Sequence, residues 1–303
     1  MEMPRRWAAD ELDQAARTAL SRFVAKRLGE GSEPYRRAFE QARPRVEALF
    51  EATGDLRALS AEVLRSDPKL IEAARYLTGP PLSQDDLDTV SGGRVSNRRS
   101  IAPALAARAL RTIQAFLDPF RCPWLASGEK PARPEVHAAI DWTASLWAVE
   151  RCRTARRGEE SAGQEEAVAA LLVGCGLSQA SNLRRIQSLD DLERGLFTRE
   201  VILGRAKADL AARLKDGRLL AIECKASNSA LNSVKRLNRE TVGKADSWRT
   251  LYGQQVVTVA VLSGVFKVAN LIDAQTAGVF ICWEHDLSPL TEFLSRVRSR
   301  PAC

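Results

Sequence analysis

The chain has 303 residues, a formal net charge of +7, and 45% hydrophobic and 27% charged residues. These values are typical of a globular protein with a sizeable core and two lobes, and the basic balance permits an acidic partner. The six cysteines include no Cys-x-x-Cys pair and only two histidines occur, which argues against a structural zinc site. The N-terminus is charged and no apolar run could span a bilayer, so we expect a soluble, cytoplasmic protein without a membrane partner.

The first half of the chain is predicted to be helical, because apolar residues recur there at helical spacing. Ser83, followed by two acidic residues, is a candidate N-cap for a further short helix. We therefore expect residues 1–155 to form an all-α domain. The predicted helices cover residues 8–28, 34–52, 55–64, 68–76, 101–116 and 134–150.

In the second half of the chain, the spacing of apolar residues changes from a helical period alone to a mixture of helix and strand periods. A helix over residues 162–175 leads to a predicted hairpin, and buried strands over 256–262 and 279–283 flank a helix over 268–276. An amphipathic helix over 290–297 follows. This order predicts that residues 156–303 form an α/β domain with a mixed central sheet flanked by helices.

The predicted hairpin carries the most informative residues of the chain. Its two apolar runs meet at Lys215-Asp216-Gly217, and Asp-Gly between such runs is a strong hairpin signal. The period of two places Glu223 and Lys225 on one face of the second strand and Cys224 on the other. Because the hairpin returns Asp209 to the same end, we expect two carboxylates and one ammonium group to converge.

This set of side chains suits a divalent metal ion beside a polyanion. Hard cations such as Mg²⁺ take oxygen ligands and keep several waters, so one or two carboxylates suffice to hold them. A bound metal ion activates water and offsets charge on phosphoryl oxygens, and a nearby ammonium group assists. We therefore expect Asp209 and Glu223 to bind metal and, with Lys225, to cleave a nucleic-acid phosphodiester.

The alternative is a solvated hairpin that carries ordinary surface charges. That interpretation suits Lys215 and Asp216, because both stand in the turn beside a glycine. It suits Glu223 and Lys225 less well, because they end an otherwise apolar run. Charges at the end of a buried strand must be paired, bound to a ligand or functional.

Glu165, in the helix before the hairpin, is a candidate additional catalytic acid. It shares a helical face with Val168 and Leu172, so it can face the sheet and assist metal binding directly or through water. The sequence is equally compatible with an acidic residue in a first helical turn, where the helix dipole favours negative charge.

A polar and basic segment follows Lys225, where the scissile phosphate would lie. Ser and Asn side chains can bond phosphates or base edges, and Lys and Arg neutralise phosphates. A solvated helix face explains each residue singly, whereas the cluster beside the acids favours DNA contact. A second basic stretch precedes the helix over 101–116. The candidate DNA-binding residues are Ser227, Asn228, Asn232, Lys235 and Arg236 in the first segment and Arg94, Arg98 and Arg99 in the second.

The ordered set of Asp209 and Glu223-Cys224-Lys225, preceded by the helix that carries Glu165, resembles the PD-(D/E)XK nuclease superfamily. The resemblance covers roughly residues 160 to 300, and the motif is specific only in that context. Ala208 stands where the superfamily has its first proline. With the stretches Tyr76–Leu87 and Ala226–Ser229, the chain resembles type II restriction endonucleases of the XamI kind.

That resemblance implies Mg²⁺-dependent cleavage of double-stranded DNA within a short, palindromic site. It also implies a homodimer, because a two-fold symmetric protein matches a palindrome. A cognate DNA methyltransferase would protect host DNA without forming a stable complex with this chain. Residues 1–155 would then serve DNA recognition or dimerisation, and residues 156–303 would be the nuclease domain.

Two other functions are compatible with the sequence. One is a repair or Mrr-like nuclease of the same superfamily, which depends on DNA structure or methylation. The other is a catalytically silent DNA-binding protein with a nuclease fold. The intact set of Asp209, Glu223 and Lys225 argues against the silent protein, because a binding module has no use for acids directed at phosphate.

Overall fold

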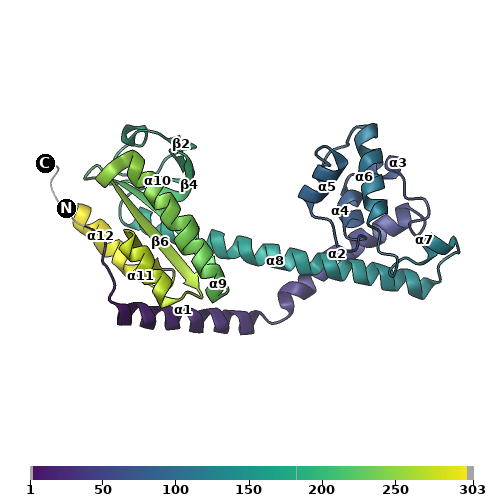
Figure 1. Cartoon of the computed structure of the whole chain (residues 1–303), viewed down its shortest axis with the longest axis horizontal. Helices are drawn as coiled ribbons and strands as arrows, with labels where there is room; N and C mark the ends of the chain where they lie inside the picture. Colours follow the sequence, from purple (N-terminus) through teal and green to yellow (C-terminus); the bar gives the residue numbers. More distant parts are fainter. Residues whose placement is uncertain (1–2, 182, 299–303) are drawn as a thin grey trace. The chain divides into compact units, whose positions relative to one another are not determined.

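The computed structural model describes residues 3–181 and 183–298, except for the side chains of Arg157 and Glu160. The chain divides into two compact units, which we call the helical unit and the sheet unit (Figure 1). The helical unit comprises Glu30–Arg156, and the sheet unit comprises Met1–Gly29 together with Arg157–Cys303.

The helical unit packs its helices around one apolar core. Trp147 is fully buried there and stacks on Tyr76, with ring centroids 5.2 Å apart. The buried Arg121 donates hydrogen bonds of 2.6 Å to the carbonyl oxygens of Tyr76 and Thr78, which ties the loop after α4 to this core. The helices are α2 (Glu33–Ala52), α3 (Ala61–Ser66), α4 (Lys69–Arg75), α5 (Gln84–Ser91), α6 (Pro103–Ala115), α7 (Trp124–Ser127) and the first part of α8 (Arg133–Gly174).

The prediction of a helix over residues 55–64 is wrong in its first half. Asp55 and Leu56 have positive φ angles of 58° and 67°, which a right-handed helix does not allow. Helix α3 begins only after Ser60, whose hydroxyl accepts a hydrogen bond of 3.3 Å from the N–H of Val63. The predicted N-cap at Ser83 is confirmed by a bond of 2.9 Å from the N–H of Asp86.

Helix α8 joins two predicted helices into one of 42 residues. Residues 151–161, between the two predictions, are mostly polar but contain no proline, so the hydrogen-bond ladder continues through them. The first part of α8 contributes Trp147 to the core of the helical unit. Its last part contributes Val168 and Leu172 to a core of the sheet unit.

The sheet unit contains a mixed sheet, as predicted. Its strand order is β1-β3-β4-β5-β6-β7, and β2 pairs with β3. Strands β3, β4 and β5 are antiparallel neighbours, whereas β5, β6 and β7 are parallel. Strand β3 was not predicted, because Arg199-Glu200 interrupts its apolar run. The strands are β1 (Ser178–Gln179), β2 (Arg185–Ile186), β3 (Leu196–Leu203), β4 (Ala206–Arg213), β5 (Leu219–Ser227), β6 (Val256–Gly264) and β7 (Val279–Trp283).

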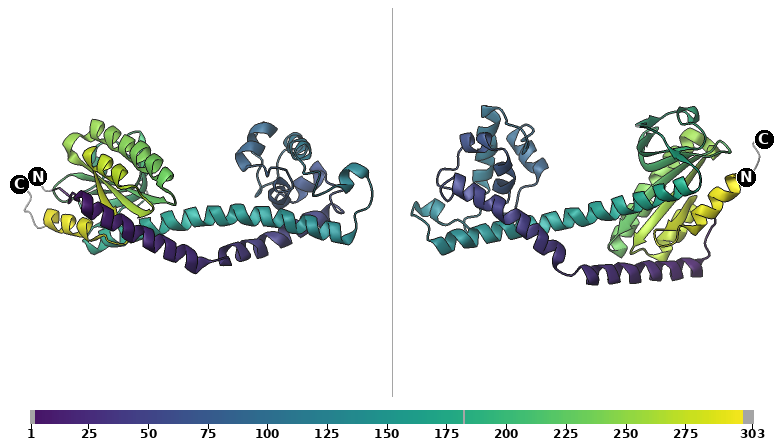
Figure 2. Two further views of the ribbon diagram at one scale, coloured as in Figure 1. Left: turned by 60° about the horizontal axis from the view of Figure 1, so that its bottom comes forward. Right: turned by 180° about the vertical axis from the view of Figure 1, so that it is seen from behind.

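Helices cover both faces of this sheet (Figure 2). The end of α8 and α12 cover one face, where they bury Leu220, Ile222 and Cys224 of β5. Leu219 and Ala221 of the same strand pack with residues of α10 on the other face, so the predicted alternation of β5 is confirmed. The helical elements of this unit are α1 (Ala9–Glu30), α9 (Ala230–Ser233), the π-helical segment η2 (Val234–Thr241), α10 (Val242–Tyr252), α11 (Val268–Thr276), α12 (Ser288–Arg298) and the 3₁₀ turns η1 (Leu189–Asp191) and η3 (Gly253–Gln255).

Helix α1 packs with the sheet unit, although its sequence lies at the other end of the chain. The indole N–H of Trp7, just before α1, donates a hydrogen bond of 2.8 Å to the carbonyl oxygen of Ile281 in β7. Leu12 is fully buried in the same core as Trp283. The predicted division near residue 155 therefore differs from the structure over residues 1–29, because an amphipathic pattern does not specify which core the helix faces.

None of the helices in the described residues is long and apolar enough to cross a membrane. The cysteines of the described residues are free thiols, and Cys303 lies outside them. The free cysteines are Cys122, Cys152, Cys175, Cys224 and Cys282.

The packing of α1 can be tested with two matched substitutions. Leu12→Ala is expected to lower the free energy of unfolding of the sheet unit by about 2–5 kcal/mol, because it empties a filled core position. Leu20→Ala, on the same helix at a position that is 43% exposed, is expected to change it by about 0.5 kcal/mol or less. Urea unfolding measures both values, and an equally small loss for both variants would contradict this packing.

Candidate active site

The candidate site forms where the pairing between β4 and β5 ends and the two strands separate. The last pair between these strands joins Leu210 to Ile222, whereas β5 stays paired with β6 to its end. Beyond that pair, the N–H of Cys224 donates a hydrogen bond of 2.7 Å to Oδ2 of Asp209 instead of to a strand. The separation therefore opens space between the strands and orients the carboxylate of Asp209 at the same time.

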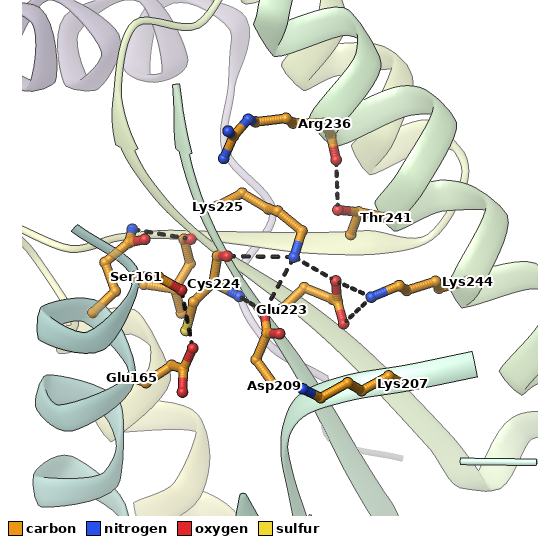
Figure 3. A network of polar contacts seen from close by, with 12 residues as sticks. Ser161, Glu165, Lys207, Asp209, Glu223, Cys224, Lys225, Arg236, Thr241 and Lys244 are labelled. Carbon is orange, nitrogen blue, oxygen red and sulfur yellow. Dashed lines mark hydrogen bonds and ion pairs between the residues drawn. The ribbon is translucent and has the colours of Figure 1, made fainter. Parts of the chain in front are cut away.

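The structure brings Asp209, Glu223 and Lys225 together (Figure 3). Nζ of Lys225 lies 3.1 Å from Oδ2 of Asp209 and 2.7 Å from Oε2 of Glu223. It also donates a hydrogen bond of 3.3 Å to the carbonyl oxygen of Cys224. One ammonium group thus contacts three oxygen atoms, two of them from carboxylates.

A second lysine, Lys244 of α10, joins this cluster and was not among the predicted site residues. Its Nζ lies 2.9 Å from Oε1 and 2.8 Å from Oε2 of Glu223. Lys244 stands four residues before the buried Trp248, so both lie on the side of α10 that faces the sheet. That spacing is the signal in the sequence that could have identified it.

Burial dominates the electrostatics of the cluster. The side chain of Glu223 has 0% exposure, and burial raises the pKa of its carboxyl group while the charge of Lys225 opposes the shift. Burial alone would lower the pKa of Lys225, but the charges of Glu223 and Asp209 outweigh it and raise that pKa. The cluster therefore pairs two carboxylates with two ammonium groups. Such pairing offsets the free energy that buried charges lose when they leave water.

Glu165 lies near this cluster but is not bonded to it within the described residues. Its Oε1 accepts a hydrogen bond of 3.0 Å from the hydroxyl of Ser161, one turn earlier in α8. Burial raises the pKa of Glu165, and the charge of Asp209 adds to the shift. The alternative of a first-turn acid is wrong, because α8 begins at Arg133.

A cavity of about 340 Å³ opens on one side of this cluster. Asp209 and Lys225 line it from the strands. Three of the predicted DNA-binding residues, Asn232, Lys235 and Arg236, line it from α9 and η2. Cationic side chains and the carboxylate of Asp209 therefore border the same space, whereas the buried Glu223 lies behind Lys225 and does not line it. Such a mixed lining suits a phosphodiester substrate.

Two other predicted DNA-binding residues make contacts within the chain. Ser227 is buried, and its hydroxyl donates a hydrogen bond of 2.8 Å to the carbonyl oxygen of Ser229. Asn228 is exposed, and its Oδ1 accepts a bond of 2.7 Å from Nδ2 of Asn232. Ser227 thus stabilises the turn into α9, whereas Asn228 orients a residue that lines the cavity.

Arg94, Arg98 and Arg99 lie in the helical unit, in the loop between α5 and α6. All three side chains are exposed. The hydroxyl of Ser96 accepts bonds of 3.2 Å from the N–H groups of Arg98 and Arg99, which shapes the loop.

Known proteins are similar in sequence to this chain over both units. A model of the XamI restriction endonuclease family matches residues 54–283. The chain belongs to this family. It is 36% identical over 264 residues to the type II restriction enzyme XamI of Xanthomonas campestris pv. amaranthicola, over 82% of this chain and 93% of that enzyme. It is 22% identical over 320 residues to the type II restriction enzyme SalI of Streptomyces albus G, over 95% and 97% of the two chains. No solved structure matches the chain significantly.

Membership of the XamI family confirms the predicted resemblance to type II restriction endonucleases and the predicted enzyme class, a deoxyribonuclease. The matched residues include Asp209, Glu223, Lys225 and Lys244, and most of the helical unit. The family match therefore extends beyond the sheet unit into the helical unit.

The donor atoms in this XamI family member fit a hard divalent cation. Within the described residues, the hydrogen bonds to Asp209 go to Oδ2 and leave Oδ1 without one, and Oε1 of Glu223 accepts one from Lys244. The described residues contain no cluster of three or more His, Cys, Asp or Glu ligands. A pair of carboxylates, of which Asp209 lines an open cavity, suits Mg²⁺, because this ion is held by one or two carboxylates and keeps several of its waters when bound to protein.

The charge balance of the cluster predicts a stability effect. Glu223→Ala is expected to lower the free energy of unfolding by about 3 kcal/mol, because it leaves two ammonium groups without their buried counter-ion. Glu166→Ala removes an ion pair of 2.7 Å with Arg199 in which the glutamate is 73% exposed, and is expected to cost about 1 kcal/mol or less. Chemical denaturation of both variants measures the difference, and equal losses would contradict the balanced cluster.

Proposed function

We propose that this chain is a Mg²⁺-dependent type II restriction endonuclease that hydrolyses both strands of double-stranded DNA within a short specific site. The observation that carries the proposal is the convergence of Asp209 and Glu223 on Lys225, beside a cavity bordered by Lys235 and Arg236. Carboxylates suit the cation, and the basic side chains suit the phosphates of the substrate.

Each side chain would have a separate part in the reaction. Asp209 and Glu223 would hold Mg²⁺, which lowers the pKa of bound water and offsets charge on the phosphoryl oxygens. Lys225 would place its ammonium group against the negative charge that builds on the phosphate. Lys235 and Arg236 would bind flanking phosphates, a contact that positions DNA without reading its sequence.

The sheet unit would be a PD-(D/E)XK nuclease core. Three features support this: α8 carries Glu165 towards the sheet, the antiparallel strands β4 and β5 carry the acids, and β6, α11 and β7 follow in order. A doubly covered mixed sheet with its acids at the separation of two strands is the arrangement that the resemblance implies.

The helical unit would supply sequence recognition or the dimer contact. Arg94, Arg98 and Arg99 are exposed there, and guanidinium groups bind phosphates and guanine edges. A homodimer would match a palindromic site by symmetry. A cognate DNA methyltransferase would protect the same site in the host.

Incubation of the purified chain with plasmid DNA and Mg²⁺ is expected to give discrete fragments, because specific recognition limits cleavage to a few sites. Chelation of the cation is expected to stop the reaction. Gel electrophoresis distinguishes the outcomes. A smear, or a preference for branched or methylated DNA, would favour the structure- or methylation-dependent nuclease, and no cleavage with any divalent cation would favour the silent protein.

Lys225→Met is expected to slow cleavage by about 100-fold or more, because it removes the ammonium group beside the phosphate. DNA binding in Ca²⁺ is expected to persist. Lys207→Met is the matched control, because Lys207 lies nearby on β4 but pairs with the exposed Glu200 at 3.0 Å (Figure 3). Full cleavage by Lys225→Met, or an equal loss in both variants, would contradict the assignment.

Glu165→Gln tests the proposed role of the additional acid. It is expected to slow cleavage by about 10-fold, because a partner beside the metal ligands would lose its charge. Glu166→Gln, the next residue on the exposed side of α8, is expected to retain wild-type activity. Single-turnover cleavage rates compare the two variants. Unchanged cleavage by Glu165→Gln would contradict a catalytic role and would leave Glu165 with only a structural role, its hydrogen bond with Ser161.

A further inference from the structure

We propose that Lys244 is a positioning residue that holds the carboxylate of Glu223 in place for the divalent cation, while Lys225 gives up its place between the two acids. This inference rests on the proposed metal site at Asp209 and Glu223. It assigns different parts to two lysines that contact the same carboxylate.

The contacts of the two ammonium groups differ. Lys225 contacts both Asp209 and Glu223, so it bridges the acids. Lys244 contacts both oxygen atoms of Glu223 and no other acid among the described residues. Lys225 therefore occupies the space between the carboxylates, whereas Lys244 approaches Glu223 alone (Figure 3).

A cation bound by both acids must compete with Lys225. Its Nζ lies 3.1 Å from Oδ2 of Asp209 and 2.7 Å from Oε2 of Glu223, so it holds one oxygen atom of each acid that would bind the cation. When the cation takes the place of Lys225, it supplies the charge that Lys225 gave up, but the side chain of Glu223 has 0% exposure, so a protein group and not bulk water must orient its carboxylate. Lys244 is the partner that can remain, because its contacts do not involve Asp209.

The packing of α10 keeps Lys244 at its position. Trp248 is fully buried against the sheet, and its indole N–H donates to the carbonyl oxygen of Ala206 in β4 at 3.4 Å. The hydroxyl of Tyr252 donates a bond of 2.7 Å to the carbonyl oxygen of Ile186. A helix attached to two strands of the same sheet holds its lysine firmly, and partners of this kind orient metal ligands.

The experiment is calorimetric titration of Mn²⁺ into the full chain without DNA, so that binding is measured apart from cleavage. Lys244→Met is expected to weaken Mn²⁺ binding by about 10- to 100-fold, the usual effect of losing a partner of a metal ligand. Lys207→Met, the neighbouring lysine paired with Glu200, is expected to bind Mn²⁺ as the wild type does. In cleavage assays, the Mg²⁺ concentration for half-maximal rate is expected to rise with Lys244→Met by the same factor.

Unchanged Mn²⁺ binding by folded Lys244→Met, or tighter binding, would overturn the role of Lys244. Circular dichroism checks the fold, and Lys244→Gln, which keeps a hydrogen-bond donor without the charge, replaces the methionine variant if that does not fold. The proposed metal site fails separately, if the wild type binds no Mn²⁺ or if Asp209→Ala binds it as well as the wild type does.

Discussion

The cluster of Asp209, Glu223, Lys225 and Lys244 depends on the burial of one carboxylate, that of Glu223. A carboxylate without exposed surface is costly unless opposite charges contact it. Lys225 comes from the same strand, but Lys244 comes from α10, so β5 and α10 must meet for the cluster to exist. The buried Trp248 that attaches α10 to the sheet is thus a condition for the proposed chemistry as well as for stability.

The part of the site that could be predicted is the part encoded by contiguous residues. An Asp-Gly turn and a period of two suffice to bring Asp209 beside Glu223 and Lys225, because a hairpin is a local structure. The contact of Lys244 with Glu223 joins two separate elements. It depends on how α10 packs on the sheet, which no pattern within either element encodes.

The same distinction explains the errors in the fold. The uninterrupted course of α8 depends on residues 151–161, whose polar composition is typical of a connector as well as of an exposed helix. Strand β3 carries charges at its centre and is stabilised by its pairing with β4. Neither segment has an apolar period that identifies it, whereas β6, α11 and β7 have strong apolar periods of their own and were predicted nearly to the residue.

The position of α1 determines how the two units follow one another along the chain. Because α1 packs with the strands that follow α8, the helical unit interrupts the sheet unit as an insertion with both ends attached. A fragment that starts near residue 156 would lack Leu12 and begin inside a helix. Exchange of the helical unit between relatives therefore requires two junctions, one near residue 30 and one within α8, and an end-to-end fusion would leave the sheet unit incomplete.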